Sequence, residues 1–435
     1  MNSDRQQTLV EIQKLISQYY AASEIPVFRP GESVVPLIEP SYGAEEVNQA
    51  VESLLLCQIT LNQSAGNKIQ QFENIWSQYI GVENGIMVNS GSSANLIALF
   101  ALANPSRENP IKPGDEIITP AVTWHTTVSP IIAIGAVPVL VDVSLDDCTI
   151  DTDAIKSQIT EKTKAIMPVH LMGNPCQMDV ILEIAQENDL YVIEDVCEAH
   201  GASFNGRRCG GIGHVGTFSF FFSHHLTTME GGMVVTADEE LAELIRIMRS
   251  QGVIRNTRKS EELAEYYRNQ PEFESIDERY LFANLGFNLR PTELNGGFGI
   301  EQFKKFPYFL ERREDNGRFW LDRLSGYEEF FHFPAGAEGE RSWFCFPLII
   351  RSNAPFDRNQ VTNFLNERKI ETRPIMAGNV TAQPAMQLFE HRRGELPNAE
   401  LIHSNGFFWG NHQGISEIQR EYVASCIDEF IAQST

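Results

Sequence analysis

Short apolar runs alternate with helical segments from about Gly43 onward, and this alternation most limits the folds open to the chain. The runs GIMVNS, EIITPA, VPVLVDV, KAIMPVHL and YVIEDV have the length and composition of buried strands. Segments with helical spacing, such as ANLIALFAL, lie between most of them. Strands joined by crossover helices pair in parallel and are covered on both faces of their sheet. The pattern therefore predicts an α/β fold with a large, mostly parallel sheet.

The pattern changes near PTELNGGFGIEQFKKFPYFLERREDNGRFWLDRL, where a long helical stretch replaces the alternation. WFCFPLII then reads as a strand and RNQVTNFLNERK as a helix of a smaller α+β unit. Helical spacing also marks residues 8–22, and the proline-containing residues 24–40 read as an extended connector. We predict three parts: an N-terminal helix and connector at 1–38, a large domain at 39–305, and a small C-terminal domain at 306–435.

Composition excludes several classes of partner. The formal net charge of −24 over 435 residues repels nucleic acids and anionic membranes. The longest apolar window, VSPIIAIGAVPVLVDV, is broken by two prolines and a glycine, and MNSDRQQ lacks the apolar core of a signal peptide. The seven cysteines are scattered and form no C-x-x-C pair, as in reduced cytosolic proteins. We therefore expect a cytoplasmic protein that binds neither nucleic acid nor membrane.

The segment VNSGSSAN, residues 88–95, has the context of a phosphate site. A strand ends there, Gly91 allows close approach of the backbone, and Ser92 and Ser93 open a helix. The free N–H groups and the dipole of a helix N-terminus favour an anion. A simple serine N-cap would explain the same residues and remains the alternative.

Two further positions follow predicted strands. Trp124 comes just after EIITPA, and loops at the carboxyl ends of parallel strands form the usual ligand crevice. There it could stack on a flat ring, although a core tryptophan is equally compatible with the pattern. Glu194 and Asp195 end the run YVIED, where a buried carboxylate is costly unless it is paired. A protonated heteroaromatic nitrogen would be such a partner, and a capping role for the aspartate is the alternative.

Gly211, Gly213 and Gly216 spell G-x-G-x-x-G, but the context argues against a dinucleotide site. That fingerprint must follow a strand and open a helix. Here the turn-like NGRRCG precedes it and the strand-like TFSFFF follows it. We expect an ordinary turn.

The stretch FSFFFSHHLTTMEGG, residues 218–232, ends an apolar run at the adjacent His224 and His225. Neighbouring residues in an extended chain point to opposite sides, so a structural pair is one interpretation. Adjacent histidines rarely chelate one metal, and no nearby cysteine or glutamate supplies the right spacing. We predict no metal site.

In their order along the chain, these motifs resemble the DegT/DnrJ/EryC1/StrS family, the sugar-aminotransferase branch of the fold-type I pyridoxal-phosphate enzymes. The resemblance runs from about residue 37 to the end and includes the N-x-R-x-x-E pattern of GFNLRPTELNGGFGIEQ. It implies an aminotransferase-like fold, with a large domain whose mostly parallel mixed sheet lies between helices and a smaller C-terminal α+β domain. It also implies a homodimer with the active site at the interface.

In the aminotransferases of this family, the F-S-F block carries the lysine that forms a Schiff base. His224 stands at that position, which resembles the family's 3-dehydratases, enzymes that make 3,6-dideoxyhexoses. SHHLTTMEGG, RPIMAGN at 373–379 and GNHQ at 410–413 are similar to the enzymes that act on GDP-4-keto-6-deoxy-D-mannose in the colitose branch of lipopolysaccharide O-antigen biosynthesis.

A second dehydratase subgroup acts on a CDP-sugar and carries a [2Fe–2S] cluster. The chain keeps Cys197 at one of that subgroup's cluster positions, but residues 249–270, the corresponding later loop, contain no cysteine. A cluster held by four thiolates cannot form from these residues, so we expect none. Residues 1–36 nevertheless resemble the cluster-containing subgroup. Both GDP and CDP sugars therefore stay open as substrates.

The resemblance implies a role for each motif. An imidazole cannot form a Schiff base, so pyridoxal or pyridoxamine phosphate would be held without a covalent link, and glutamate would regenerate the amine form. Asp195 would keep the pyridine nitrogen protonated. His224, with an unperturbed pKa near ~6.5, would be the base that allows the C3 hydroxyl to leave. The remaining implied residues are Gly91, Ser92 and Ser219 at the cofactor phosphate, Trp124 and Glu198 on the cofactor, Asn288 from the second subunit, and Arg255 and Arg290 on the substrate.

Two rival interpretations are weaker. A sugar aminotransferase that uses another lysine is disfavoured because residues 209–257 contain no lysine. A non-catalytic relative that only binds a nucleotide sugar is disfavoured because Asp195, Trp124 and the Gly-Ser loop are all kept.

Overall fold

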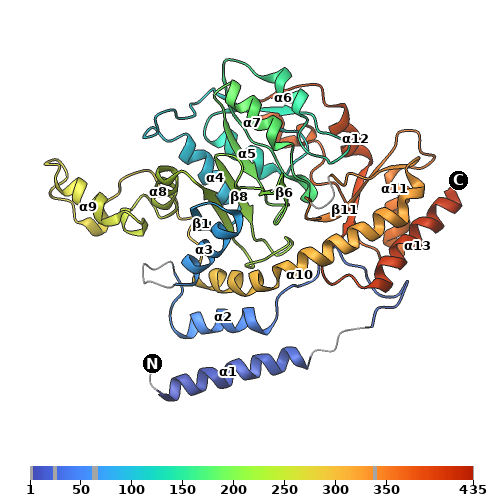
Figure 1. The fold of residues 1–435 in the computed structure, drawn as a ribbon, viewed down its shortest axis with the longest axis horizontal. Coiled ribbons are helices and arrows are strands. Elements are labelled where there is room, and N and C mark those ends of the chain that lie inside the picture. The colour runs from blue at the N-terminus through green and yellow to red at the C-terminus, as the bar shows by residue number, and fades with distance from the viewer. Residues whose placement is uncertain (1–2, 23–26, 61–66, 337–339, 435) are drawn as a thin grey trace.

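Two β-sheets, joined by one long helix, organise the protein (Figure 1). The computed structural model describes residues 3–22, 27–60, 67–336 and 340–434. The joining helix, α10 (Glu293–Leu324), runs below the two sheets and above α2 in Figure 1, from the large sheet to the small one.

The large sheet has eight strands in the order β1-β9-β8-β5-β4-β2-β3-β13. The strands from β8 to β13 pair in parallel, and only β9 runs against its neighbours. The predicted, mostly parallel sheet is therefore confirmed. The bounds are β1 Asn84–Val88, β2 Glu116–Pro120, β3 Val137–Val141, β4 Thr163–Ile166, β5 Tyr191–Asp195, β8 Val215–Ser219, β9 Gly232–Thr236 and β13 Arg392–Arg393.

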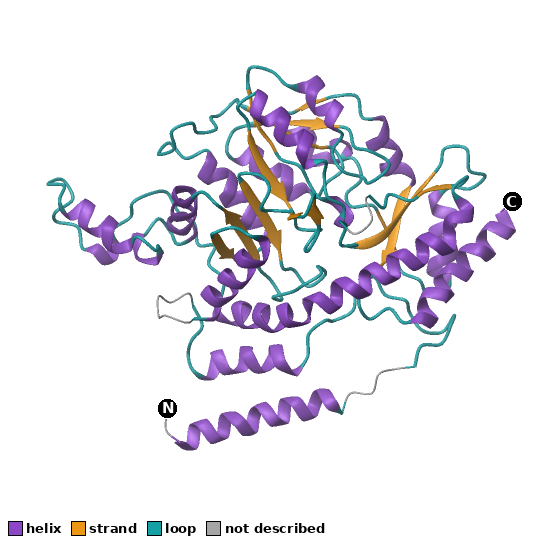
Figure 2. Cartoon of the chain, viewed as in Figure 1, coloured by secondary structure: helices purple, strands orange, loops and turns teal. Residues whose placement is uncertain are grey.

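Helices cover both faces of this sheet (Figure 2). Successive strand residues point to opposite faces, so Met87 packs in one core and its neighbours Ile86 and Val88 in the other. The first core takes side chains from α3 (Lys68–Ile80), α6 (Thr152–Gln158), α7 (Met178–Glu187) and α10. The second takes them from α4 (Gly91–Leu102), α5 (His125–Ala133) and α8 (Glu239–Arg249).

The small sheet is antiparallel, in the order β10-β11-β14-β12. Its strands are β10 Phe331–His332, β11 Cys345–Ile350, β12 Thr372–Pro374 and β14 Gly406–Gly410, with helices α11 Arg358–Glu367, α12 Pro397–Asn405 and α13 Glu417–Ser434. Trp320 of α10 packs in the core of this unit. Residue 305 lies inside α10, and β13 returns to the large sheet. The proposed division of the chain at 305 stays a prediction.

The N-terminal helix predicted at 8–22 lies within α1 (Ser3–Ala21), which packs along α2 (Ala44–Leu55) (Figure 1). Only Leu9 of α1 is buried. In the predicted connector, residues 24–26 lie outside the described residues, and Val35 forms a β-bridge with Ile370.

An arm containing α9 (Ser260–Arg268) projects from the far end of the large sheet (Figure 1). The remaining short elements are strands β6 Ser203–Phe204 and β7 Arg207–Arg208 and the 3₁₀ turns Leu171–Gly173, Ile254–Asn256, Glu278–Tyr280, Ser325–Tyr327, Val380–Ala382 and Pro384–Leu388.

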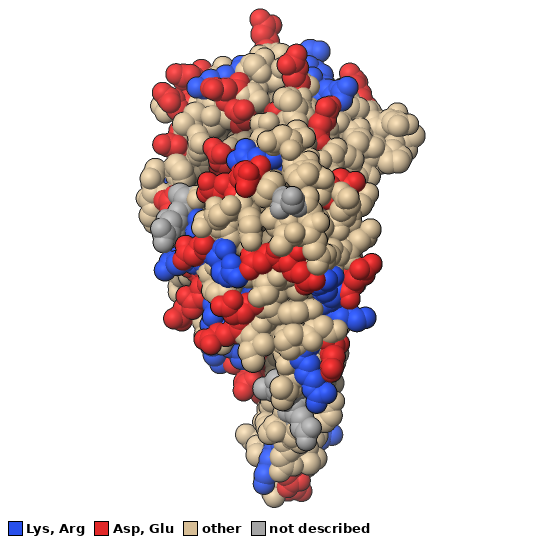
Figure 3. All heavy atoms as spheres, turned by 90° about the vertical axis from the view of Figure 1, so that its right-hand side faces the viewer, with Lys and Arg blue, Asp and Glu red and all other residues tan. Residues whose placement is uncertain are grey.

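The surface carries charges of both signs. On the face shown in Figure 3, lysine and arginine side chains are interspersed with acidic ones and form no continuous basic patch. Within the described residues, every helix is too short or too polar to cross a membrane.

Candidate active site

A cavity of about 680 Å³ opens where β2, β5 and β8 of the large sheet reach their carboxyl ends. This is the predicted edge for a ligand crevice in a parallel sheet. Residues of the small unit complete its wall. The residues that matter below are Ser90, Gly91, Ser92, Trp124, Asp195, Glu198, Ser219 and His224 from the large sheet's side, and Arg313, Phe344, Arg373 and His412 from α10 and the small unit.

The Gly-Ser loop forms the N-terminus of α4. Ser90 is the N-cap, and its hydroxyl accepts the N–H of Ser93 at 3.1 Å. A Cβ on Gly91 would lie 2.3 Å from Cβ of Ser219, so only glycine lets the end of β8 pack against this helix end. The first turn of α4 and the hydroxyl of Ser219 thus meet at the cavity. The N-cap role belongs to Ser90, and the phosphate role belongs to the first turn of α4. Both interpretations are therefore compatible with this loop.

Asp195 lies at the end of β5, is 3% exposed, and is held from three sides. Its Oδ2 accepts hydrogen bonds from Asn95 and from Thr127, both at 2.8 Å, and its Oδ1 accepts the N–H of Cys197 at 3.2 Å. Thr217 in turn donates to Oδ1 of Asn95 at 2.5 Å. These bonds fix the carboxylate at the cavity wall, and among the described residues no cationic side chain bonds to it.

Trp124 begins α5, lines the cavity and is 58% exposed, so the alternative of a core tryptophan is wrong. Glu198 also lines the cavity but is 8% exposed. Burial, together with the charge of Asp195, raises the pKa of Glu198 to about 8. Its carboxyl accepts the N–H of Met172 at 3.1 Å. At neutral pH Glu198 is therefore mostly a neutral acid.

His224 lies in the turn after β8 and lines the cavity. Its Nδ1 is buried and has no hydrogen-bond partner among the residues that the structure describes, which leaves Nε2 as the nitrogen available to the cavity. Burial, and then the guanidinium of Arg313, lower the pKa of His224 to about 3. The site therefore lowers this pKa from its unperturbed value near ~6.5. The imidazole is neutral at pH 7 and can accept a proton.

His225 does not line the cavity. It is fully buried, and its Nε2 lies 3.0 Å from the carbonyl oxygen of Ser342. The two adjacent histidines therefore have different environments, one facing the cavity and one facing the interior.

The sequence model of the DegT/DnrJ/EryC1/StrS aminotransferase family matches residues 42–428. The chain belongs to this family. A GDP-4-keto-6-deoxy-D-mannose 3-dehydratase of Yersinia pseudotuberculosis is 38% identical over 87% of this chain and 94% of that relative. A dTDP-4-dehydro-2,6-dideoxy-D-glucose 3-dehydratase of Saccharopolyspora spinosa is 35% identical over 97% of this chain and 91% of its own.

A solved structure also matches this member of the family. It is GDP-4-keto-6-deoxymannose-3-dehydratase with a trapped PLP–glutamate geminal diamine, with a TM-score of 0.81 and 34% identity over 90% of this chain and 99% of that one. The similarity confirms the predicted aminotransferase-like fold with a mixed, mostly parallel large sheet.

Three of the residues suggested by the family resemblance lie away from this cavity. Asn288 is exposed and forms a β-bridge with Ser250, and Arg290 donates to its side chain at 3.1 Å. Arg255 is exposed in a 3₁₀ turn. The expected roles, Asn288 acting from a second subunit and Arg255 and Arg290 binding the substrate, stay predictions.

The sequence reasoning missed several residues of the site. Arg313 of α10 is 3% exposed and donates to the carbonyl oxygens of Trp343, Phe344 and Asn411. The sequence did contain a signal for Arg313, since it is an arginine within the apolar face of a helix. Asn95 lies one helical turn after Gly91, and Thr127 lies three residues after Trp124. Each is therefore on the same side of its segment as the residue that the sequence had indicated.

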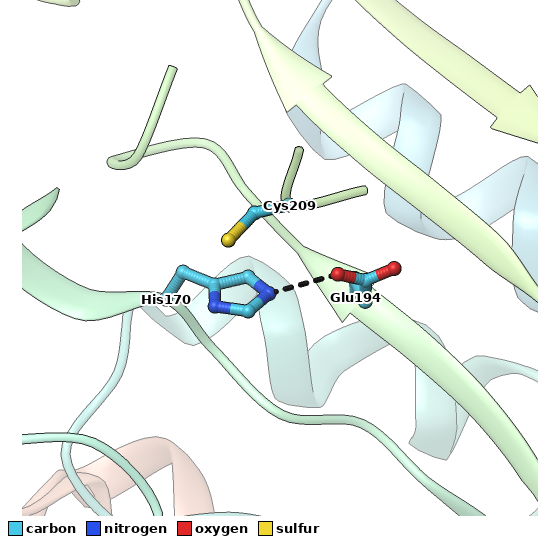
Figure 4. A group of neighbouring side chains, drawn as sticks. All are labelled: His170, Glu194 and Cys209. Atoms are coloured by element: carbon cyan, nitrogen blue, oxygen red, sulfur yellow. Dashed lines mark hydrogen bonds and ion pairs between the residues drawn. The ribbon is translucent and has the colours of Figure 1, made fainter. Parts of the chain in front are cut away.

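A buried cluster outside the cavity has the composition of a metal site but not its free ligands (Figure 4). Nε2 of His170 lies 3.1 Å from Oε2 of Glu194, and its Nδ1 accepts the N–H of Cys176 at 3.0 Å. Glu194 also accepts the N–H groups of Gly210, Ile212 and Gly213 at 2.6–2.8 Å. Both ring nitrogens and both carboxylate oxygens are in use, so we assign this cluster a structural role. The G-x-G-x-x-G turn is held by Glu194 and leads into β8, as expected.

His412 provides a test of the acid sensitivity of this region. Burial, and then Arg313, lower the pKa of His412 to about 4 in the folded protein, against about 6.5 in an unfolded chain. Between these values the unfolded chain binds the extra proton, so the free energy of unfolding falls as pH falls. Between pH 6 and pH 4, the free energy of unfolding of the wild type should fall by up to about 1.4 kcal/mol per pH unit more than that of His412→Gln. Urea unfolding at each pH measures this free energy. If its dependence on pH is parallel in the wild type and in His412→Gln, the prediction is wrong.

Proposed function

We propose that this protein removes the C3 hydroxyl of a nucleotide-4-keto-6-deoxyhexose in a pyridoxal-phosphate-dependent reaction and yields a 3,6-dideoxy-4-keto sugar. The observation that carries the proposal is His224, which lines the cavity where the family's aminotransferases have a lysine. No lysine is among the described residues that line this cavity. The substrate proposed first is GDP-4-keto-6-deoxy-D-mannose, as in the Yersinia relative.

The residues present fit the cofactor. Gly91 leaves room for a phosphate beside Ser219 and the first turn of α4, and an anion is favoured there by free N–H groups. Trp124 offers an exposed ring for stacking. Asp195 has no cationic partner in its hydrogen-bond set, so a protonated pyridine nitrogen would complete it. The bound cofactor supplies an electron sink conjugated to C4 of the sugar and an amino group that is exchanged with glutamate.

His224 is the proton carrier of the proposed reaction. Its neutral Nε2 accepts a proton at the reacting end of the site and can return it to the C3 hydroxyl as that group leaves as water. Asn95 and Thr127 keep the carboxylate of Asp195 in place throughout. Phe344 and Trp124 limit the water that reaches the site.

We further propose a cytoplasmic homodimer whose partner subunit supplies Asn288, Arg255 and Arg290 to the site. The α9 arm supports it, because apolar side chains along it are left exposed to solvent: Tyr266, Tyr280, Phe282 and Leu285, each 59–67% exposed. An exposed apolar surface of this kind is typical of an interface. Light scattering of the purified protein measures the mass; a monomer would contradict the proposal.

The nucleotide is tested by product analysis. The protein, pyridoxal phosphate and glutamate are incubated with the GDP-, dTDP- and CDP-linked 4-keto-6-deoxyhexoses, and the sugars are analysed by mass spectrometry. We expect the GDP sugar to lose one oxygen atom fastest. The dTDP sugar is a second candidate because the Saccharopolyspora relative covers 97% of the chain. A 4-amino sugar that keeps its C3 hydroxyl would contradict the proposed reaction.

The cofactor should be bound without a covalent link to the chain, because an imidazole at position 224 cannot form a Schiff base. Borohydride treatment of the protein with pyridoxal phosphate, followed by peptide mass analysis, should find no stoichiometric adduct on any lysine. A stoichiometric adduct would refute this prediction. His224→Lys is the positive control.

We predict no iron–sulfur cluster, because residues 249–270 contain no cysteine. Anaerobic purification followed by iron and sulfide analysis should give far less than one cluster per chain. Stoichiometric iron with cluster absorbance would contradict it.

A further inference from the structure

Arg313 is a buried cation that lines the cavity and has no anionic partner. It lies in α10 and is 3% exposed, and burial lowers its pKa to about 10, so it is charged at pH 7. No carboxylate among the described residues pairs with it, although Asp195 and Glu198 line the same cavity. A buried charge without a counter-ion is costly, so this guanidinium calls for a ligand of opposite charge.

Only part of the guanidinium of Arg313 is used by the protein. Its Nη1 donates to the carbonyl oxygens of Trp343 and Phe344, at 3.0 Å and 2.9 Å, and to that of Asn411. An arginine has five N–H groups, and those on Nε and Nη2 have no partner in the part of the chain that the structure describes. Nε is enclosed by the protein, which leaves Nη2 as the group that a ligand in the cavity can reach.

A structural role explains the contacts of Nη1 but not the charge. These contacts tie α10 to the segment before β11 and to the residue after β14, and carbonyl oxygens carry only partial charges. The neighbouring Arg312 shows the contrast. It donates to the carbonyl oxygen of Ile415 at 3.0 Å, and it also has a carboxylate partner, Asp315, at 3.8 Å. Arg313 lacks such a partner among the described residues, and its charge is left for a ligand.

The charge of Arg313 acts on the inner part of the cavity. Burial lowers the pKa of each of four histidines, and Arg313 lowers it further: His224 and His412, which line the cavity, and His200 and His225, which are fully buried. A positive potential that no nearby carboxylate offsets attracts an anionic ligand.

Two kinds of anion enter this cavity in the proposed reaction, the carboxylates of glutamate and the diphosphate of the nucleotide sugar. The α-carboxylate is bonded directly to the reacting carbon of glutamate, whereas two ring carbons and the glycosidic oxygen separate the diphosphate from C3 of the sugar. Arg313 is buried and acts on His224, so it lies at the reacting end of the cavity. Arg373 also lines the cavity but is exposed, and it is better placed for the diphosphate of a larger ligand.

We infer that Arg313 binds a carboxylate of the amino donor through Nη2. A carboxylate has the charge and the geometry that a guanidinium recognises best, and charge-assisted hydrogen bonds of this kind are strong in a buried site. The ligand class is therefore an α-amino acid or the corresponding 2-oxo acid. The inference rests on the proposed function, in which glutamate is the donor.

Binding of glutarate tests this inference without turnover. Glutarate has the carbon chain and both carboxylates of glutamate but no amino group, so it cannot react. In calorimetric titration of the holoprotein, Arg313→Gln should bind glutarate about 10–100-fold more weakly than wild type, as expected for one lost charge-assisted hydrogen bond. Arg312→Gln is the matched control, because it removes the neighbouring charge outside the cavity, and it should bind like wild type. No binding by wild type, or equal binding by wild type and Arg313→Gln, would overturn the inference.

A parallel titration with GDP identifies the source of the anion. The affinity for GDP should be the same in wild type and Arg313→Gln. If GDP loses affinity in this variant and glutarate does not, the guanidinium binds a phosphate and the assignment to a carboxylate is wrong.

Circular dichroism establishes whether Arg313→Gln is folded. If it does not fold, a crystal structure of the wild-type holoprotein with glutarate decides. One carboxylate of glutarate should lie within hydrogen-bond distance of Nη2 of Arg313. A glutarate bound elsewhere, or none bound, would contradict the inference.

The inference and the proposed function can fail separately. If wild type forms no 3-deoxy sugar but binds glutarate through Arg313, the proposed function is wrong and the carboxylate site stands. If wild type dehydrates the sugar and Arg313→Gln keeps the wild-type KM for glutamate and affinity for glutarate, only the inference is wrong.

Discussion

His224→Asn is expected to bind the cofactor and the nucleotide sugar and to lose sugar dehydration by about 10²–10⁴-fold, the usual cost of a lost general base. The phosphate loop, Trp124 and Asp195 do not depend on the imidazole, so binding should persist. Absorbance of the bound cofactor and single-turnover formation of the 3-deoxy sugar measure the two properties separately.

His224→Lys tests the same assignment from the opposite side. A lysine can form a Schiff base and can return a proton to the sugar carbon. This variant should lose dehydration and gain weak transamination, detected as a 4-amino sugar. Near wild-type dehydration by His224→Asn would place the base elsewhere and refute the assignment of His224.

Asp195→Asn should reduce both halves of the reaction, the consumption of glutamate and the dehydration of the sugar. The amide keeps the size of the side chain but removes the negative charge proposed to pair with the pyridinium. Loss of one partner of a buried ion pair costs about 3–5 kcal/mol. That range corresponds to roughly 10²–10⁴-fold in rate. Rapid-mixing absorbance with glutamate alone, and then with the sugar, measures each half.

Glu198→Gln is the matched control for this substitution. Glu198 lines the same cavity, and its pKa, raised to about 8 by burial, makes the carboxyl mostly neutral at pH 7. A neutral amide should therefore change either half-reaction far less than Asp195→Asn does. An equal loss in both variants would show that hydrogen bonding, and not the charge of Asp195, matters.

Local pattern was sufficient to predict the parallel sheet and the motifs at its carboxyl edge. Alternating segments gave the strands; Asp195 ends one of them, and Gly91 and Trp124 lie three and four residues after the ends of two others. Each of these residues lies at the cavity because parallel strands place their carboxyl ends at one edge. The position of His224 came from the family resemblance rather than from spacing.

Properties that depend on packing between distant segments could not be predicted in this way. The pKa of His224 in the folded protein could not be predicted because it depends on burial and on Arg313, which lies 89 positions further along the chain. The environment of His225 likewise depends on the carbonyl of Ser342, from the segment before β11. Strand β13 is two residues long and carries no strand pattern of its own.

The central claim is that the protein uses the amino group of glutamate to remove an oxygen from the sugar. The amino group is then released and does not stay on the sugar. The direct test is the ratio of ammonia released to 2-oxoglutarate formed during turnover with glutamate and GDP-4-keto-6-deoxy-D-mannose. In the proposed reaction each glutamate oxidised yields one ammonia and one 3-deoxy-4-keto sugar, so the ratio should be one to one. If 2-oxoglutarate forms without ammonia and a 4-amino sugar accumulates, the protein is an aminotransferase and the account is wrong.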